Sequence, residues 1–479
     1  MNLLRDILKN TFFLSLGTLV SRILMVFFVA LLARTLGPVG VGTYSFVLAL
    51  IAVFMILPNF GFDTLLVREV SKSKDGKSEF VLNIINIKLL LALVASFLLI
   101  SFIILKRYDT EMLQIMLLLL LSGIFHTILS SFYSIFRAHE KMELEAILTI
   151  INRLLRVLFG IVAIKIGLGL SSIVSALVLG DALSVLCALY ITNRKFIRIK
   201  LLLPTRMIKN ICLAAVPFGV LTVIDVVFLN TDYLMIANLQ SESAVGWYAA
   251  ASKLLGMIYL IPSMFMLVIF PVLSRLSVLS SDLLRQTYSK SFYYLLMISI
   301  PIAVGGFLVS DQIILGIYGQ QFRNSILIFQ VMVWLVIFNF VGWINGTTLN
   351  ASGREKMFAA TWSCFALANI VLDYIFIKRF GYIGACYVTL ILNGIDFFLY
   401  SIICHRQLSV KIEWPIIWKS LVASITMGGI IFILKGTSIS VFILILIGAF
   451  TYIGMIFVLR TLPREDVIAI RKLAVKHSV

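Results

Sequence analysis

Residues 41–58 read VGTYSFVLALIAVFMILP, and residues 245–262 read VGWYAAASKLLGMIYLIP. Aligned without a gap, the two stretches share Val, Gly, Tyr, Leu and Pro at positions separated by 204 residues (245 − 41). A second offset of 215 residues (355 − 140) matches Glu140-Lys141-Met142 with Glu355-Lys356-Met357, and Asp181 with Asp396. Two offsets this close together indicate an internal repeat.

Both repeated stretches are almost entirely apolar, and so is the chain around them. Of the 479 residues, 61% are hydrophobic and 13% are charged, whereas soluble domains carry about 25% charged residues. The composition excludes a soluble protein and predicts an all-α integral membrane protein. The formal charge of +18 does not indicate nucleic acid as a partner, because a basic patch with that role would need a soluble surface.

Hydropathy predicts about fourteen transmembrane helices, since a bilayer core about 30 Å thick takes roughly 20 apolar residues per helix. The predicted spans are 11–33, 41–63, 81–105, 113–137, 146–166, 171–192, 210–237, 247–271, 290–310, 324–347, 359–377, 382–404, 416–434 and 440–459.

The repeat offset covers six predicted spans, an even number, so both copies enter the membrane in the same direction. Such a parallel repeat is related by an axis along the membrane normal, with a substrate path between the lobes. We expect an N-terminal lobe at residues 1–200, a C-terminal lobe at 201–410, and spans 13 and 14 with a cytoplasmic tail at 411–479. The alternative is a duplicated but inert scaffold.

Positive charge predicts the orientation. The even-numbered connections and the two tails hold roughly three times as many Lys and Arg residues as the odd-numbered connections. Because such residues accumulate on the cytoplasmic side, we expect a multi-pass protein of the cell membrane with both termini in the cytoplasm.

Four cations of the first lobe lie within predicted spans: Arg22, Lys88, Arg153 and Arg156. Each costs about 3 kcal/mol at the bilayer centre, and Asp181 is the one carboxylate well inside a span of that lobe. Surplus positive charge predicts an anion site, and the guanidinium fork suits phosphate. The alternative for Lys88 is that its side chain extends to the lipid headgroups.

Polar residues recur at helical spacing around these cations. Ser15, Thr18 and Arg22 form one stripe in span 1, and span 4 carries another, made of Ser122, His126, Ser130, Tyr133 and Arg137. We interpret them as the lining of a wet cavity, together with Asp225 and Lys253 of the second lobe. Close helix packing is the alternative for the small residues. His126 is interpreted either as a packing residue or as a proton relay.

The second lobe carries mainly acidic groups. Asp225 and Asp232 are seven residues apart and share a helix face, and Asn369 and Asp373 share another. Carboxylates beside an amide oxygen in a helix bundle can bind Na⁺ or take up a proton. No spacing is typical of a transition-metal or nucleophilic catalytic site, so we expect neither an enzyme nor a cofactor beyond a coupling ion.

Several segments resemble the multidrug/oligosaccharidyl-lipid/polysaccharide exporter superfamily and, within it, the Wzx-like polysaccharide flippases. They are Ser21-Arg22, LARTLGPVGVGTY (32–44), Asn59-Phe60-Gly61 before Arg68-Glu69, FRAHEKMELEA (136–146), NTDYLMIA (230–237), VGWYAAASKL (245–254), IYGQQF (317–322), LNASGREK (349–356) and residues 369–385.

The resemblance implies two six-helix lobes plus two helices, and alternating access for a polyprenyl-diphosphate-linked oligosaccharide. It implies a cavity role for Arg22 and a sodium site at Asp232, Asn369, Asp373 and Thr389. It also implies a monomer that works beside glycosyltransferases and a glycan polymerase.

Two other functions remain open. A multidrug/cation antiporter of the same superfamily would need an acidic cavity, against which the arginines of the first lobe argue. A membrane glycan polymerase or ligase would need a sizeable outer loop with acid/base residues, and the predicted outer connections are short.

Overall fold

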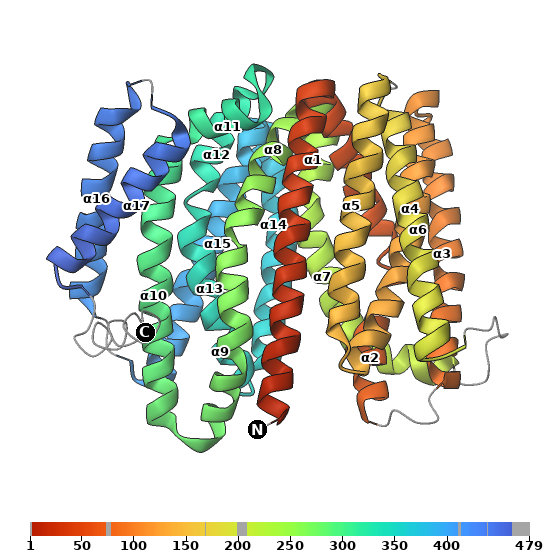
Figure 1. Ribbon diagram of the computed structural model, residues 1–479, viewed down its shortest axis with the longest axis horizontal. Coiled ribbons are helices and arrows are strands. Elements are labelled where there is room, and N and C mark those ends of the chain that lie inside the picture. The colour runs from red at the N-terminus through yellow and green to blue at the C-terminus, as the bar shows by residue number, and fades with distance from the viewer. Residues whose placement is uncertain are drawn as a thin grey trace, which may run out of the picture. The chain divides into compact units, whose positions relative to one another are not determined.

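The computed structural model describes residues 2–72, 78–167, 169–198, 208–410, 413–437 and 439–461. These residues form helices and no strand (Figure 1). The helices are α1 (Asn2–Phe54), α2 (Phe62–Lys72), α3 (Ser78–Lys106), α4 (Thr110–Ala138), α5 (Met142–Ile166), α6 (Leu170–Lys195), α7 (Ile208–Leu239), α8 (Glu242–Ile258), α9 (Leu260–Leu279), α10 (Ser281–Leu308), α11 (Ser310–Tyr318), the 3₁₀ helix η1 (Gln320–Phe322), α12 (Asn324–Met332), α13 (Leu335–Ala351), α14 (Glu355–Phe380), α15 (Tyr382–Leu408), α16 (Trp414–Lys435) and α17 (Val441–Val458).

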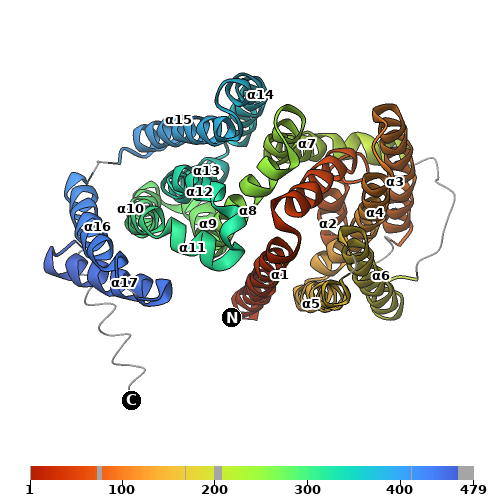
Figure 2. The same cartoon turned by 90° about the horizontal axis from the view of Figure 1, so that it is seen from above.

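Thirteen helical segments of the described chain are long and apolar enough to cross a membrane. The first, Ser15–Phe54, has 40 residues, or about 60 Å at 1.5 Å per residue, twice the thickness of a bilayer core. Gly37 has φ 66° and ψ −168°, outside the helical range, and Pro38 lacks the N–H that a continuous helix needs. The helix therefore bends there (Figure 2) and supplies two spans. This confirms the predicted all-α architecture with about fourteen spans.

The boundaries of α9 and α10 differ from the predicted spans, which ended at residue 271 and began again at residue 290. In the structure, α9 continues to Leu279 and α10 begins at Ser281. Polar residues such as Asp282 and Arg285 lower the hydropathy of this segment but do not stop a helix. Ser280 caps α10, because its side chain accepts a hydrogen bond from the Leu283 amide.

The chain divides into two compact units. Unit 1 comprises Met1–Ala250 and Ala359–Ala385, and unit 2 comprises Ala251–Phe358 and Cys386–Val479. In unit 1, α5 packs against α1 and α6, and α4 packs against α2 and α6. In unit 2, α10 packs against α13 and α16, and α16 packs against α17. The lobe boundaries expected at residues 200 and 410 stay predictions.

The core of unit 1 includes the amphipathic helix α2. Its apolar residues Phe62, Leu65, Leu66 and Val70 fall on one side and are buried. They pack in one cluster with residues of α3 and α4 such as Ile84, Phe132 and Phe136.

The repeated glycines Gly42 and Gly246 lie at a helix crossing within unit 1. A Cβ atom on Gly42 would lie 1.8 Å from the carbonyl oxygen of Glu242, and one on Gly246 would lie 1.9 Å from that of Pro38. Pro38 and Glu242 are themselves 204 residues apart (242 − 38). Reciprocal contacts of this kind are the signature of a two-fold relation. The two copies of the repeat therefore meet where only glycine fits.

Candidate functional site

A buried charged network in unit 1 surrounds Asp181 of α6. Arg156 Nη1 of α5 lies 3.0 Å from both carboxylate oxygens of Asp181, and Arg156 Nη2 donates to the Tyr44 hydroxyl at 3.3 Å. Asn152 Nδ2 and the Ser122 hydroxyl also donate to Asp181, at 2.9 and 2.5 Å. Every member of this network has partners, as a buried ion pair requires.

A second buried ion pair involves Lys88 of α3. Its ammonium group lies 2.6 Å from Asp63 Oδ1 of α2 and 2.9 Å from the Ser130 hydroxyl of α4. The Lys88 side chain is only 1% exposed, so it does not extend to lipid headgroups. Two of the four predicted anion-binding cations are thus paired with carboxylates inside the protein.

Arg153 and Arg22 differ from these paired cations. Arg153 Nε donates to the Ser21 hydroxyl of α1 at 3.0 Å, which places Arg153 beside the residue that precedes Arg22. Arg153 makes no ion pair with any described residue, and both arginines keep part of their surface accessible. The structure therefore brings Arg153 next to the Arg22 segment and leaves Arg153 without a carboxylate partner in the described chain.

Two serines of the polar stripe on α4 bond to the buried charged groups described above. Ser122 bonds to Asp181 and Ser130 to Lys88. His126 lies one turn from each of these serines and is exposed.

The other predicted residues lie further along α4 or on other helices. At the C-terminal end of α4, Arg137 makes a bidentate ion pair with Glu145, at 2.7 and 2.5 Å. Tyr133 is half-buried, as is Ser15 on α1, whereas Thr18 is exposed. Lys253 is half-buried on α8 and belongs to unit 2.

An acidic cluster is also buried in unit 1. Asp232 of α7 is 7% exposed, and Asn369 and Asp373 of α14 are 1% and 0% exposed. The carboxyl group of Asp373 interacts with the side chains of both other residues, and the Tyr248 hydroxyl donates to Asp232 Oδ2. Among the described residues, neither carboxylate oxygen of Asp373 nor Oδ1 of Asn369 has a hydrogen-bond partner.

These orphaned oxygens fit a bound cation or proton, because a buried carboxylate without a partner is strongly disfavoured. Oxygen atoms are also the ligands that hard cations prefer. The fourth predicted ligand, Thr389, lies on α15 in unit 2. In the part of the chain that the structure describes, no group of three or more His, Cys, Asp or Glu side chains could hold a metal ion.

Several partners that the structure supplies were not predicted from the sequence, among them Asp63, Asn152, Tyr44 and Tyr248. Tyr44 and Tyr248 are identical positions of the repeat, and each reaches a buried charged group. Their repetition was the signal that could have identified them. Asp63 carried no signal, because it lies at the edge of a predicted span.

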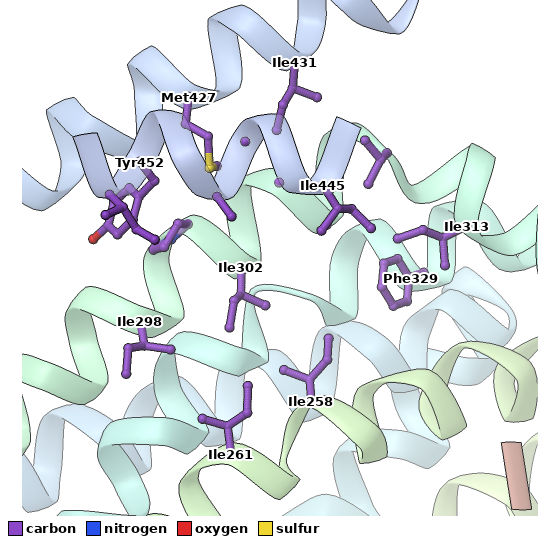
Figure 3. A pocket seen from close by; sticks show the side chains of 17 residues that line it. Ile258, Ile261, Ile298, Ile302, Ile313, Phe329, Met427, Ile431, Ile445 and Tyr452 are labelled. Carbon is purple, nitrogen blue, oxygen red and sulfur yellow. The ribbon is translucent and has the colours of Figure 1, made fainter. Parts of the chain in front are cut away.

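Unit 2 contains an apolar pocket of about 550 Å³ (Figure 3). Side chains of α9 and α10, such as Ile261, Ile298 and Ile302, face Met427 of α16 and Ile445 of α17 across it. The hydroxyl of Tyr452, which also lines the pocket, donates to the Met297 carbonyl at 2.6 Å. With its polar atom engaged elsewhere, the pocket can hold a hydrocarbon chain but offers nothing to bind a polar group.

Solved structures of transporters have the same fold. The inward closed conformation of the lipid II flippase MurJ aligns with a TM-score of 0.79 at 20% identity, covering 95% of this chain and 99% of that one. An inward-facing multidrug resistance MATE transporter of the MOP superfamily aligns with a TM-score of 0.61 at 15% identity, covering 83% and 94%. The fold is therefore that of the multidrug/oligosaccharidyl-lipid/polysaccharide exporter superfamily.

Residues 7–277, more than half of the chain, match the family described as polysaccharide biosynthesis protein, and the chain belongs to this family. A putative O-antigen transporter of Shigella flexneri is 22% identical over 79% of this chain and 93% of its own length. A probable low-salt glycan biosynthesis flippase, Agl15 of Haloferax volcanii, is 24% identical over 46% of this chain and about half of its own length (48%). The resemblance to Wzx-like proteins is confirmed, and the relatives are named as transport proteins, not as enzymes.

Proposed function

We propose that this protein flips a polyprenyl-diphosphate-linked oligosaccharide, such as a repeat unit of O-antigen, capsule or exopolysaccharide, from the cytoplasmic to the outer leaflet of the cell membrane. The observation that carries the proposal is Arg153, a deep but accessible cation that makes no ion pair with any described residue. A cation in a membrane protein is costly unless it has a task. Binding the diphosphate of a lipid carrier is such a task.

The diphosphate first meets Arg153, and Arg22, which follows the Ser21 partner of Arg153 on α1, is the second cation of the proposed site. A guanidinium group can donate two parallel hydrogen bonds to a phosphate. Arg156 and Lys88 start from a paired state, with Asp181 and Asp63, so they contribute positive charge to the site only when a conformational change or the ligand loosens those pairs. Of the four predicted cations, Arg153 and Arg22 are thus direct ligands. Arg156 and Lys88 are available only after their ion pairs loosen.

The lipid part of the cargo is accommodated by apolar surface. The pocket of unit 2 matches the chemistry of a prenyl chain, because its lining is aliphatic and aromatic. A long polyprenyl chain exceeds this pocket, so its remainder lies in the bilayer.

Coupling to a cation is supported by the acidic cluster. Na⁺ or H⁺ bound by Asp232, Asn369 and Asp373 offsets one of the two negative charges that the buried carboxyl groups can carry. Such a cation drives alternating access only if its affinity differs between the inward-open and outward-open states. Both termini lie in the cytoplasm. The protein acts as a monomer that receives its cargo from glycosyltransferases and passes it to a glycan polymerase.

The test is export of glycan by a flippase-deficient host that expresses the protein or a variant. Arg153→Ala is expected to lower the export rate by about tenfold or more, the effect of losing one charged hydrogen-bonding group. Lys165→Ala is the matched control, because Lys165 is an exposed cation near the end of the same helix. Both variants are checked for equal amounts in the membrane.

Two results would overturn the proposal. One is wild-type glycan export by the Arg153→Ala variant. The other is resistance to cationic drugs without any glycan export by the wild type, which would identify a multidrug antiporter.

A further inference from the structure

Asp225 of α7 and Trp362 of α14 form a polar and aromatic pair within unit 1. The indole Nε1–H of Trp362 donates to Asp225 Oδ1 at 3.0 Å. Phe228, one turn from Asp225, packs against Trp362 with ring centroids 4.8 Å apart. Asp225 is exposed and makes no ion pair with any described residue. One carboxylate oxygen is therefore bonded to the indole, while the Asp225 residue as a whole stays exposed.

The depth of Asp225 makes this exposure informative. It lies near the middle of the 32-residue helix α7, about 25 Å from the start of the helix and about 20 Å from its end. An exposed carboxylate at that depth is strongly disfavoured against lipid. The surface around Asp225 and Trp362 therefore faces water or a polar ligand.

A carboxylate beside aromatic rings suits a sugar. The apolar face of a sugar ring packs on indole and phenyl rings, which combine an apolar body with a polar edge. Its hydroxyl groups are donors, and an ionised carboxylate is a pure acceptor that can bond to two of them. The same carboxylate repels a phosphate, so this surface is unsuited to the diphosphate.

We propose that Asp225, Trp362 and Phe228 form a carbohydrate-binding subsite that holds a sugar ring of the lipid-linked glycan. The inference rests on the proposed function and adds to it a site for the glycan, distinct from the arginines that bind the diphosphate. The two parts of the cargo bind at different sites because of their charge. The anionic diphosphate binds to Arg153, and the sugar binds to Asp225 and Trp362.

The subsite is built on the same two helices as the acidic cluster. Asp225 precedes Asp232 by seven residues on α7, and Trp362 precedes Asn369 by seven residues on α14. Seven residues are two helical turns, about 10 Å. A shift of α14 against α7 would alter both sites, which gives the sugar a direct route to influence cation binding.

The experiment measures binding of short-chain prenyl diphosphates to the purified, full-length protein in lipid nanodiscs. The probes are citronellyl diphosphate and its conjugates with glucose, galactose, mannose or N-acetylglucosamine. The sugar gain is the ratio of the Kd of the bare diphosphate to the Kd of the best conjugate. In the wild type we expect a gain of about tenfold, the value of one or two good hydrogen bonds with a charged acceptor.

Asp225→Asn and Trp362→Ala are expected to reduce the sugar gain to about twofold or less without changing the Kd of citronellyl diphosphate. Trp362→Phe keeps a ring but loses the N–H donor, and an intermediate gain is expected. Trp343→Ala is the control, because Trp343 is another membrane-helix tryptophan, 38% exposed, that makes no hydrogen bond to a carboxylate of the described residues. Its sugar gain should match the wild type.

The outcomes separate the two proposals. If no sugar raises the affinity of the wild type, or if the gain survives in both Asp225→Asn and Trp362→Ala, the carbohydrate subsite is wrong. If Arg153→Ala leaves the Kd of citronellyl diphosphate unchanged, the proposed function fails instead. Tight binding of tetraphenylphosphonium that is lost in Asp225→Asn, without a sugar gain, would make the surface an organic-cation site and overturn the inference.

Discussion

Tyr44 and Tyr248 occupy the same position in the two copies of the internal repeat, yet their hydroxyl groups bond to buried groups of opposite charge. The hydroxyl of Tyr44 accepts a hydrogen bond from Arg156, and that of Tyr248 donates one to Asp232. A tyrosine can serve both roles because its O–H is donor and acceptor. Duplication thus kept the scaffold while the charged partner changed.

The same divergence separates Asp181 from Asp396, which also match in the repeat. Asp181 is bonded to Arg156, Asn152 and Ser122. Asp396 Oδ1 is buried and has no hydrogen-bond partner in the part of the chain that the structure describes. The two matching carboxylates of the repeat therefore differ in their hydrogen bonding.

We expect different phenotypes when each of the two repeated tyrosines is replaced by phenylalanine. Tyr248→Phe removes the donor to Asp232, and we expect a changed dependence of glycan export on the Na⁺ concentration or on pH. Tyr44→Phe is its matched control from the other copy of the repeat, and it should leave that dependence unchanged. Equal ion dependence of the two variants would contradict the assignment of Tyr248 to the cation site.

Asp373→Asn should uncouple transport from the cation. The variant keeps the shape of the side chain but removes the charge that a bound cation or proton would neutralise. We expect loss of Na⁺-dependent thermal stabilisation of the purified protein, together with export that no longer responds to Na⁺ or to pH. Stabilisation by Na⁺ equal to that of the wild type would show that sodium does not bind at Asp373.

The buried pair of Arg156 and Asp181 predicts a non-additive pair of substitutions. Arg156→Leu alone leaves Asp181 buried without its counter-ion, a loss of about 3–5 kcal/mol of stability. Arg156→Leu with Asp181→Leu leaves no buried charge and should recover much of that loss. Unfolding in a detergent series measures both, and additive losses would argue against a direct pairing.

Because only glycine fits at the crossing of the two repeats, we expect a side chain introduced there to destabilise the protein. A Cβ on Gly42 would lie 1.8 Å from the Glu242 carbonyl oxygen, so Gly42→Ala must push the helices apart. We expect a loss of about 1–3 kcal/mol and reduced export. Gly256→Ala on α8 is the control, because a Cβ there meets nothing within 4 Å. Similar behaviour of the two variants in thermal unfolding and export would refute the role of the crossing.

Filling the apolar pocket should weaken the binding of lipids with long prenyl chains. Ala449 lines the pocket, and Ala449→Trp would occupy much of its volume. We expect weaker binding of long polyprenyl diphosphates and unchanged binding of citronellyl diphosphate, measured in nanodiscs. Ala449→Val, which adds little volume, is the control. An equal effect on both chain lengths would place the prenyl chain elsewhere.

The sequence by itself was sufficient to predict the class of fold. Backbone polar groups in lipid must be bonded within the segment, so long apolar stretches can only be helices, and hydropathy located nearly all of them. The identities between residues 41–58 and 245–262 indicated the repeat. Helical spacing also predicted the polar face of α4, because positions three and four residues apart share a side of a helix.

Tertiary structure alone decided which charge meets which partner. Lys88 and Asp63, Arg156 and Asp181, and Asp225 and Trp362 each lie on different helices. Periodicity gives the face on which a side chain lies, but not the neighbouring helix that this face contacts. Two arginines that look equivalent in the sequence, Arg153 and Arg156, therefore differ in the fold. Arg156 pairs with Asp181, and Arg153 makes no ion pair in the described chain. The reason is that helix packing brings a carboxylate within reach of Arg156 only.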